Sequence, residues 1–525
     1  MPTILTLLIF TPLAGALLVL LPRNERAVWN TAAIVSLVPL ALSFYLFAAF
    51  DASAAGYQFV ETYPWIPQFG ISYHVGVDGL SLVLAVLTTV LITISLFYSG
   101  GGDITERPRE FCFFVLALET GLLGTMLAID VFLFYVFWEL MLIPMYFMIG
   151  IWGHGRKIYA AIKFVLYTMS GSILMLVAIL YVVGTANRVQ GRITFDLPAL
   201  MGLPFTPTEA RFLFAAFALA FAIKVPMWPV HTWLPDAHTE APTAGSVMLA
   251  GVMLKMGGYG FLRFAIPLFP AVAIEAIPVF MALAVIGIIY GALVAMVQPD
   301  LKRLVAYSSV SHLGFVMLGI FAFNVEGLDG AVYQMLNHGI STGALFLLVG
   351  MLYMRRHTRA ISEFGGLWHS VPVYAAVFMV AMLSSAGLPG LNGFVGEFLI
   401  MLGAFLRSWP AVAFAVTGII LGALYMLWAY ERVMFGPITK AVNETIADLS
   451  AREIGVMVPL MALMLFMGLY PKMLITRIEP SINVVVQQVN QARARLEMER
   501  GGAAVASLGS ALSNAAHSNG GVGGK

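Results

Sequence analysis

Charge and cysteine are what this sequence has least of. Only 10% of its 525 residues are Asp, Glu, Lys or Arg, whereas soluble domains carry about 25%. So few charges cannot cover a soluble protein of this length, which excludes soluble enzymes and disordered chains. A net charge of +1 provides no basic surface for nucleic acid. The single cysteine, Cys112, excludes a disulfide framework, a cysteine zinc site and an iron–sulfur cluster.

Long apolar runs are abundant, since 60% of the residues are hydrophobic. A helix needs about 20 mostly apolar residues to cross a bilayer. The sequence therefore predicts an all-α polytopic membrane protein with about fourteen transmembrane helices. The predicted segments are 3–22, 28–50, 79–99, 111–129, 131–152, 162–184, 211–229, 243–264, 275–297, 301–323, 330–354, 371–407, 410–431 and 454–471.

Two of these segments contain helix breakers. Segment seven ends in Pro226 and Pro229, and segment twelve is too long for one span and carries Pro389 between two glycines. Broken helices leave backbone groups unpaired, which a membrane tolerates only beside protein or water. Breaks at matching places in two halves are typical of inverted-repeat transporters. We therefore expect two inverted five-helix repeats, with helices seven and twelve broken.

The segments suggest five regions along the chain. The last region contains a short amphipathic surface helix at 481–499, followed by a flexible, Gly/Ser-rich tail at 501–525. The predicted regions are 1–110 (helices one to three), 111–264 (first repeat), 275–435 (second repeat), 436–475 (last transmembrane helix) and 476–525 (tail).

Lys and Arg in short loops set the expected orientation. They are more frequent in loops that follow odd-numbered segments, and such loops face the cytoplasm. Both termini are then expected on the non-cytoplasmic side of a bacterial inner membrane. Residues 3–22 lack a basic stretch before the apolar run, so we expect no cleaved signal peptide.

A small set of titratable side chains falls inside the predicted spans. Ionisable groups at membrane depth are costly and mark functional sites by default. A Glu–Lys pair whose separation changes can alter the proton affinity of the lysine, and histidine relays protons through either ring nitrogen. The set therefore predicts a proton path, and it consists of Glu119, Glu139, Lys163, Lys224, Lys255, His312, His338 and Glu397.

Structural roles for these groups stay open. Glu139 and Lys224 could form an ion pair that only joins two helices, and His312 and His338 could make only interhelical hydrogen bonds. Lys163 lies about one helical turn inside the membrane boundary, where snorkelling to the surface is favoured.

Two stretches resemble the antiporter-like subunits of respiratory complex I. They are Phe137–Pro144, which reads FWELMLIP, and Lys224–Gly258, which includes HTWLPDAH at 231–238 and APT at 241–243. The resemblance extends over about residues 75–435. Sister subunits of this family usually have a lysine where this chain has Glu397, so the glutamate favours the member type that differs from them.

The resemblance implies a role for each matched residue. Glu139 would modulate Lys224, the central protonatable lysine, and Lys255 would pass the proton onward. The terminal site would be Glu397, reached through two central histidines. The remaining implied roles are axis histidines (His312, His338), supporting histidines (His231, His238) and accessory charges (Glu119, Lys163).

The resemblance also implies partners. The chain would be the proton-translocating part of an NADH:quinone oxidoreductase, without a redox site or cofactor of its own. NADH, FMN, iron–sulfur clusters and quinone would bind partner subunits, and its neighbours would be sister antiporter-like subunits and membrane lipids. The alternatives are a subunit of a multisubunit sodium/proton antiporter, a subunit of a membrane-bound hydrogenase-type complex, and a structural scaffold.

Overall fold

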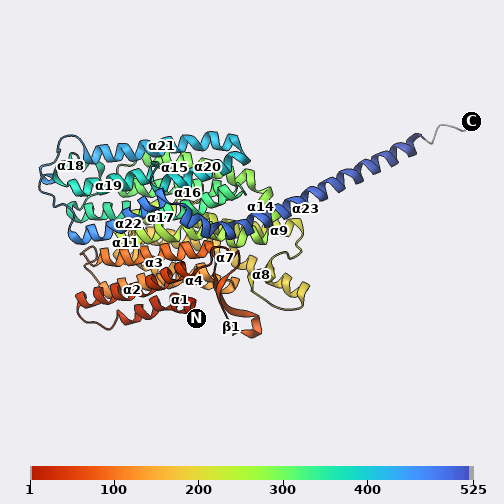
Figure 1. The fold of residues 1–525 in the computed structure, drawn as a ribbon, viewed down its shortest axis with the longest axis horizontal. Coiled ribbons are helices and arrows are strands. Elements are labelled where there is room, and N and C mark those ends of the chain that lie inside the picture. Colours follow the sequence, from red (N-terminus) through yellow and green to blue (C-terminus); the bar gives the residue numbers. More distant parts are fainter. Residues whose placement is uncertain (1–2, 520–525) are drawn as a thin grey trace, which may run out of the picture.

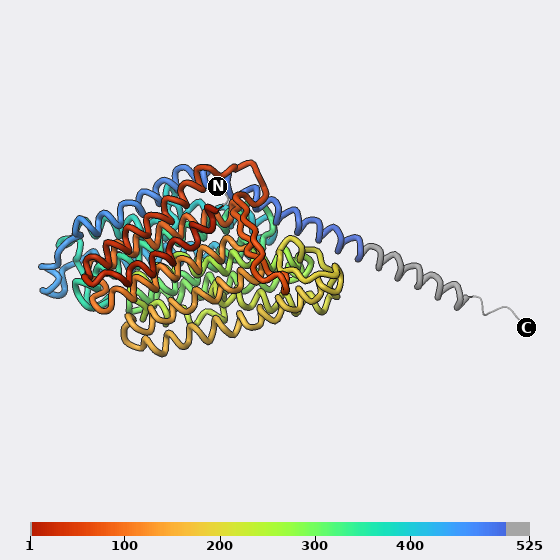
Figure 2. The backbone as a smooth tube through the Cα atoms, turned by 90° about the horizontal axis from the view of Figure 1, so that it is seen from below, coloured from red at the N-terminus to blue at the C-terminus, as the bar shows by residue number. Residues whose placement is uncertain are grey.

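A bundle of long, roughly parallel helices forms the body of the protein (Figure 1). The computed structural model describes residues 3–519, and side chains as far as Glu499. A short β-hairpin lies at one end of the bundle, and the C-terminal helix leaves the body and points away from it (Figure 2).

The N-terminal half contains the hairpin and the first broken helix. Its elements are α1 (Ile4–Leu18), α2 (Glu25–Ala49), β1 (Gln58–Ile66), η1 (Pro67–Phe69), β2 (Ile71–Val77), α3 (Gly79–Ser99), α4 (Pro108–Leu127), α5 (Val131–Leu140), α6 (Leu142–Trp152), α7 (Lys157–Gln190), α8 (Leu197–Leu200), α9 (Pro207–Lys224), α10 (Trp233–Glu240), α11 (Thr243–Met248), η2 (Leu249–Met253), α12 (Lys255–Gly260), η3 (Phe261–Ala265) and α13 (Ile266–Leu268).

The C-terminal half contains the second broken helix and the long last helix. Its elements are α14 (Pro270–Glu275), α15 (Ile277–Met296), α16 (Leu301–Ile320), α17 (Val325–Arg356), η4 (Ile361–Glu363), α18 (Leu367–Ser370), α19 (Pro372–Ser385), α20 (Asn392–Arg407), α21 (Trp409–Met434), η5 (Ala441–Asn443), α22 (Ala451–Leu469) and α23 (Lys472–Asn519).

Each predicted apolar segment coincides with one or more helices. In the described residues, eleven helices are long and apolar enough to cross a membrane, and α1 and α19 are shorter apolar helices. The count of fourteen spans and the two inverted repeats stay predictions. Both predicted breaks are confirmed, because α9 ends at Lys224 before α10 begins at Trp233, and α19 ends at Ser385 before α20 begins at Asn392.

The expectation of an all-α fold misses the antiparallel pair of β1 and β2. These strands are rich in aromatic and β-branched residues, which favour extended backbone, and Gly70 takes the left-handed conformation at the turn (φ 65°). Buried Glu61 of β1 accepts a hydrogen bond from the backbone N–H of Leu5 at 2.7 Å. Ser72 of β2 donates its N–H to Asp130, which caps α5. The hairpin thus fixes the starts of α1 and α5.

Segment eight is not a regular α-helix. Two π-helical stretches, η2 and η3, flank α12, and every residue of η2 and α12 is buried. π-Helical turns occur mostly as short insertions, frequently at functional sites. They place Lys255 at the first residue of α12.

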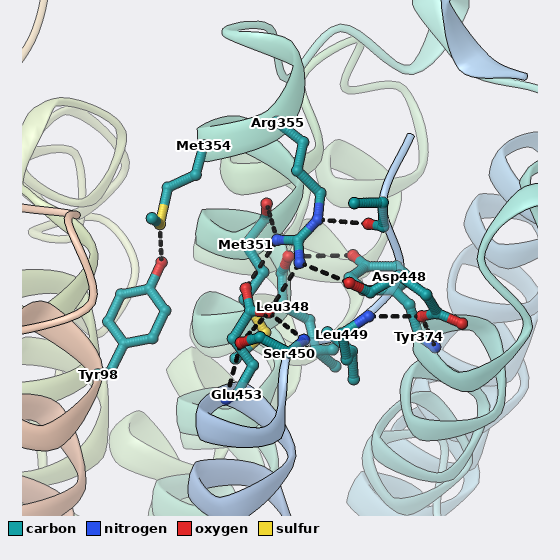
Figure 3. A network of polar contacts seen from close by, with 11 residues as sticks. Tyr98, Leu348, Met351, Met354, Arg355, Tyr374, Asp448, Leu449, Ser450 and Glu453 are labelled. Carbon is teal, nitrogen blue, oxygen red and sulfur yellow. Dashed lines mark hydrogen bonds and ion pairs between the residues drawn. The ribbon is translucent and has the colours of Figure 1, made fainter. Parts of the chain in front are cut away.

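Arg355 clamps the ends of α17 and α22 together (Figure 3). Its guanidinium forms a two-pronged ion pair with Glu453, with both N···O distances 2.7 Å. It also donates to the backbone carbonyls of Ala447 and Asp448. The Asp448 carboxylate in turn accepts the N–H of Tyr374 at the start of α19. Paired arginine–carboxylate bonds are geometrically specific, so this clamp fixes three helices relative to one another.

The C-terminal helix is longer than the short surface helix predicted at 481–499. It packs on the bundle through one buried stripe with helical spacing, made of Ile478, Ile482, Val485, Val489 and Ala492. The helix then continues to Asn519, where a flexible tail was predicted. Residues 501–519 contain six alanines, the strongest helix formers, and these offset the interspersed glycines. Residues 520–525 of the predicted tail lie outside the described residues.

Candidate functional site

A polar stripe runs along the buried helix α17. Gln334, Asn337, His338 and Ser341 stand at positions i, i+3, i+4 and i+7 of the helix, so they share one face. All four are at most 3% exposed. Asn337 donates to the Gln334 side-chain oxygen at 3.0 Å and to the backbone carbonyl of Asn392 at 2.8 Å. The stripe therefore connects α17 to the start of α20.

Lys255 meets this stripe at His338. Its Nζ lies 2.6 Å from Nδ1 of His338, and it also donates to the backbone carbonyl of Ala250 in η2. The lysine is fully buried. At this distance the two nitrogens form a hydrogen bond, whose donor depends on the protonation state of each side chain.

His312 of α16 connects His338 to Glu397 of α20. The two histidine ring centroids are 5.8 Å apart. Nδ1 of His312 lies 3.1 Å from Oε1 of Glu397, and Gln334 donates to the same oxygen at 3.1 Å. We call Lys255, His338, His312 and Glu397 the axis cluster.

The break between α19 and α20 supplies more polar groups to the axis cluster. Ser385 contacts Nε2 of His312 at 3.2 Å, and Ser384 contacts Ser341 of the stripe at 2.6 Å. Gly393 has no space for a side chain, because an added Cβ would lie 2.0 Å from the Ser384 carbonyl oxygen. Glycine there lets the two half-helices approach closely, so the break itself becomes a wall of the cluster.

A small cavity lies in the middle of the axis cluster. Its volume is about 10 Å³, and its walls include His312, His338, Ser341 and Ser385. That volume is about enough for one water molecule. A water there would have hydrogen-bond partners on several sides, so it can bridge the two histidine rings.

Lys224 ends the first half of the other broken helix. It is 1% exposed, and its Nζ has no hydrogen-bond partner among the described residues. The ammonium lies 5.0 Å from the ring centroid of Trp138 and 5.7 Å from that of Phe164. Glu139, next to Trp138, is close enough for its charge to act on Lys224, although the two form no ion pair in the part of the chain described. The lysine is held by aromatic faces, with the carboxylate at longer range.

His231 and His238 lie beside the first break. His231 packs edge-on against Tyr290, with ring centroids 5.1 Å apart. His238 stacks on Phe346 at 4.8 Å, and its charge would act on both Lys255 and Lys302. Neither ring nitrogen of either histidine has a hydrogen-bond partner within residues 3–519.

Lys163 and Glu119 have different surroundings. Lys163 of α7 does not extend freely to the surface, because its Nζ forms an ion pair with Asp236 of α10 at 2.7 Å. Glu119 of α4 is fully buried, and neither carboxylate oxygen has a hydrogen-bond partner in the described region. The structure places neither residue in contact with the axis cluster.

A second group of polar side chains, partly buried at Asp103, lies where the α3–α4 connection meets α11. Asp103 accepts a hydrogen bond from Thr243 Oγ1 at 3.0 Å. Burial raises the pKa of Asp103 to about 6, against the lowering effects of Thr243 and of nearby Lys302. Lys302 itself donates to the backbone carbonyl of Ala241. These contacts hold the start of segment eight in place.

Sequence reasoning missed several polar residues of the site. Asp236, inside the quoted HTWLPDAH motif, was not identified as the partner of Lys163. The stripe on α17 carries a signal, because Gln334, Asn337 and Ser341 repeat at helical spacing around His338. Ser385 has no comparable signal, since its contact with His312 depends on how the broken helix folds back.

Comparisons of the sequence with known proteins agree on one family. A family model described as NADH:quinone oxidoreductase/Mrp antiporter, TM, matches residues 128–422. The chain is 45% identical over 505 residues to NADH-quinone oxidoreductase subunit M of Rhodobacter capsulatus, which covers 93% of the chain and 97% of the relative. It is 43% identical over 526 residues to the subunit of the same name from Mycobacterium tuberculosis, which covers 93% and 94%.

Solved structures show the same similarity. A chain of respiratory complex I from Thermus thermophilus with bound NADH superimposes with a TM-score of 0.85 at 33% identity, which covers 92% of this chain and 99% of that one. A chain of the Mrp complex from Dietzia matches with a TM-score of 0.80 at 21% identity, over 93% and 99%. At that identity, the second match shows a shared fold alone.

Proposed function

The chain belongs to the NADH:quinone oxidoreductase/Mrp antiporter transmembrane family, as an antiporter-like membrane subunit of the complex I type, and we propose that it moves protons through the axis cluster. The observation that carries the proposal is the row of titratable side chains from Lys255 through His338 and His312 to Glu397, joined by a contact at each end and by a water-sized gap between the two histidine rings. Every side chain in that series can take up and release a proton.

The geometry of each step supports a relay. A proton on Lys255 already faces Nδ1 of His338, so transfer needs no rearrangement. The next step crosses the gap between the histidine rings, where the cavity has space for about one water. The last step follows the contact between His312 and Glu397. Histidine suits the middle positions because it binds a proton on one nitrogen while it releases one from the other.

Lys224 is the point at which the relay would be loaded and controlled. A buried ammonium without a hydrogen-bonded partner costs several kcal/mol, so its charge depends on the nearest carboxylate. Glu139 is that carboxylate in the structure. A charge change in a neighbouring subunit that draws Glu139 away would therefore expel the proton from Lys224 towards Lys255.

The remaining predicted residues take supporting roles in this proposal. His231 and His238 border the first break and would support the water-filled part of the route. Lys163 joins α7 to α10 through Asp236 and would hold the second half of the broken helix in place. Glu119 would act as an accessory or inter-subunit charge.

The redox chemistry that drives this movement is proposed to lie in partner subunits. NADH, FMN, iron–sulfur clusters and quinone would be bound there, and sister antiporter-like subunits would flank this chain in a bacterial inner membrane. Loops after odd-numbered segments would face the cytoplasm, and both termini would face the other side.

A sodium/proton antiporter subunit is the second candidate, supported by the fold shared with the Mrp complex.

The test is Lys224→Ala in the assembled complex. We expect NADH-driven proton pumping to be lost or severely reduced, while electron transfer from NADH to an artificial acceptor and assembly on native gels persist. Lys440→Ala is the matched control, because Lys440 lies in a loop with a half-exposed side chain and its loss should leave pumping intact. Normal pumping by Lys224→Ala would refute the proposal.

A further inference from the structure

An apolar furrow lies between α2 and α22, with α3 as its floor. Its volume is about 820 Å³. The α22 side of the furrow is a single stripe of residues with helical spacing, which extends along most of that helix. The stripe consists of Gly455, Val456, Pro459, Ala462, Leu463 and Phe466.

The furrow continues towards the far end of α22. A second apolar cavity of about 150 Å³ shares Phe44, Val90, Leu463 and Phe466 with it and reaches Met473. Since α22 has 19 residues, its length at 1.5 Å per residue is about 28 Å. That matches the hydrocarbon thickness of a bilayer, about 30 Å.

Arg452 stands at one end of the furrow. It donates to the backbone carbonyls of Phe97 and Gly100 at the end of α3. No acidic side chain pairs with it in the described chain, and the adjacent Glu453 is already bound by Arg355. Trp29 packs beside it at Gly100. The end of the furrow therefore has one uncompensated positive charge and one indole, a residue type enriched at membrane surfaces.

We propose that this furrow is a binding site for one anionic phospholipid, whose phosphate contacts Arg452 and whose acyl chains fill the groove along α22. The uncompensated arginine and the walls, which are apolar apart from Thr93, match the two parts of such a lipid. A helix from a partner fits less well, because it would have to supply a separate acidic side chain to compensate Arg452, whereas an anionic phospholipid supplies the phosphate and the apolar chains together. The site is independent of the proton route.

The experiment uses the purified assembled complex in nanodiscs containing phosphatidylglycerol with a photoreactive acyl chain. After illumination, mass spectrometry should find crosslinks on α3 and α22. Gly455→Trp should remove most of them, because a Cβ at Gly455 meets nothing within 4 Å and its indole would enter the groove. Gly184→Trp is the matched control, since Gly184 is equally open on α7 and lies outside the furrow.

A second variant tests the headgroup. Arg452→Gln keeps a donor for the two carbonyls and removes the charge, so the preference for phosphatidylglycerol over phosphatidylcholine should fall about fivefold. If a variant fails to assemble, competition of unlabelled phosphatidylglycerol against phosphatidylcholine on the unmodified complex decides the same question. Crosslinks that persist in Gly455→Trp, equal competition by both lipids, or crosslinks that join the furrow only to a partner subunit would each overturn the proposal.

Discussion

Asp103 should make the α3–α4 connection less stable as the pH rises. Burial raises its pKa from 3.8 to about 6, which corresponds to about 3 kcal/mol. When the connection opens, Asp103 reaches water and ionises near its ordinary pKa, so the open state binds fewer protons than the closed one between pH 4 and 6. The closed state is therefore at its most stable below about pH 4 and loses stability until about pH 6.

Asp103→Asn removes this effect, because asparagine cannot ionise and still accepts the Thr243 hydrogen bond. Hydrogen exchange of the amides at 100–107 in the purified complex measures the opening. The ratio of protection in the variant to that in the unmodified protein should be near one at about pH 4 and rise to about a hundredfold above pH 6.

Asp51→Asn is the control for this prediction. Asp51 is exposed, and hydrogen bonds from Ser53 lower its pKa, so the same substitution there should give no gain at high pH. A protection ratio for Asp103→Asn that does not change with pH would refute the reasoning, since it would mean that burial does not penalise the charged carboxylate.

Two further predictions concern the route and the orientation. Gln334→Met removes a hydrogen-bond donor that lies 3.1 Å from Glu397. Because a hydrogen bond to a charged group contributes about 1.5–3 kcal/mol, proton pumping should slow about tenfold while the complex still assembles. An unchanged pumping rate would argue against a route through Glu397. Cysteines at Ser53 and Lys440 should react with a membrane-impermeant maleimide from opposite sides of the membrane, against a low background because Cys112 is buried; labelling from the same side would contradict the proposed orientation.

The broken helices were predictable because their causes are local. Pro226 and Pro229 remove backbone donors, and Gly387 adopts a left-handed φ of 78° beside Pro389, so each break is encoded within a few residues. The titratable groups were predictable for a similar reason, since a charge within an apolar run is visible without any knowledge of its neighbours. Their contacts were not, because His338 and Lys255 are 83 positions apart.

Other features depend on tertiary packing, which a sequence pattern does not predict. Nothing in the apolar stretch around Lys255 distinguishes a π-helix from an α-helix, because both bury every residue there. Lys163 illustrates the converse, since its position favours snorkelling and only the fold of the broken helix brings Asp236 to it. The flexible tail was predicted because residues 501–525 contain few large apolar side chains, but such a composition does not exclude a helix, since each glycine costs only about 1 kcal/mol there.

The polar stripe on α17 limits which parts of the protein can act as a switch. Gln334, His338 and Ser341 belong to one unbroken helix of 32 residues, so their mutual distances cannot change unless that helix bends. The partners of the stripe, by contrast, include Ser384 and Asn392 at the second break, where Pro389 has no N–H to donate and the regular helix is interrupted between α19 and α20. Two states of the protein would therefore share the same α17 and differ in how the break between α19 and α20 is positioned along it. Small displacements of Ser384 and Asn392 would then determine how much proton flow differs between the two states.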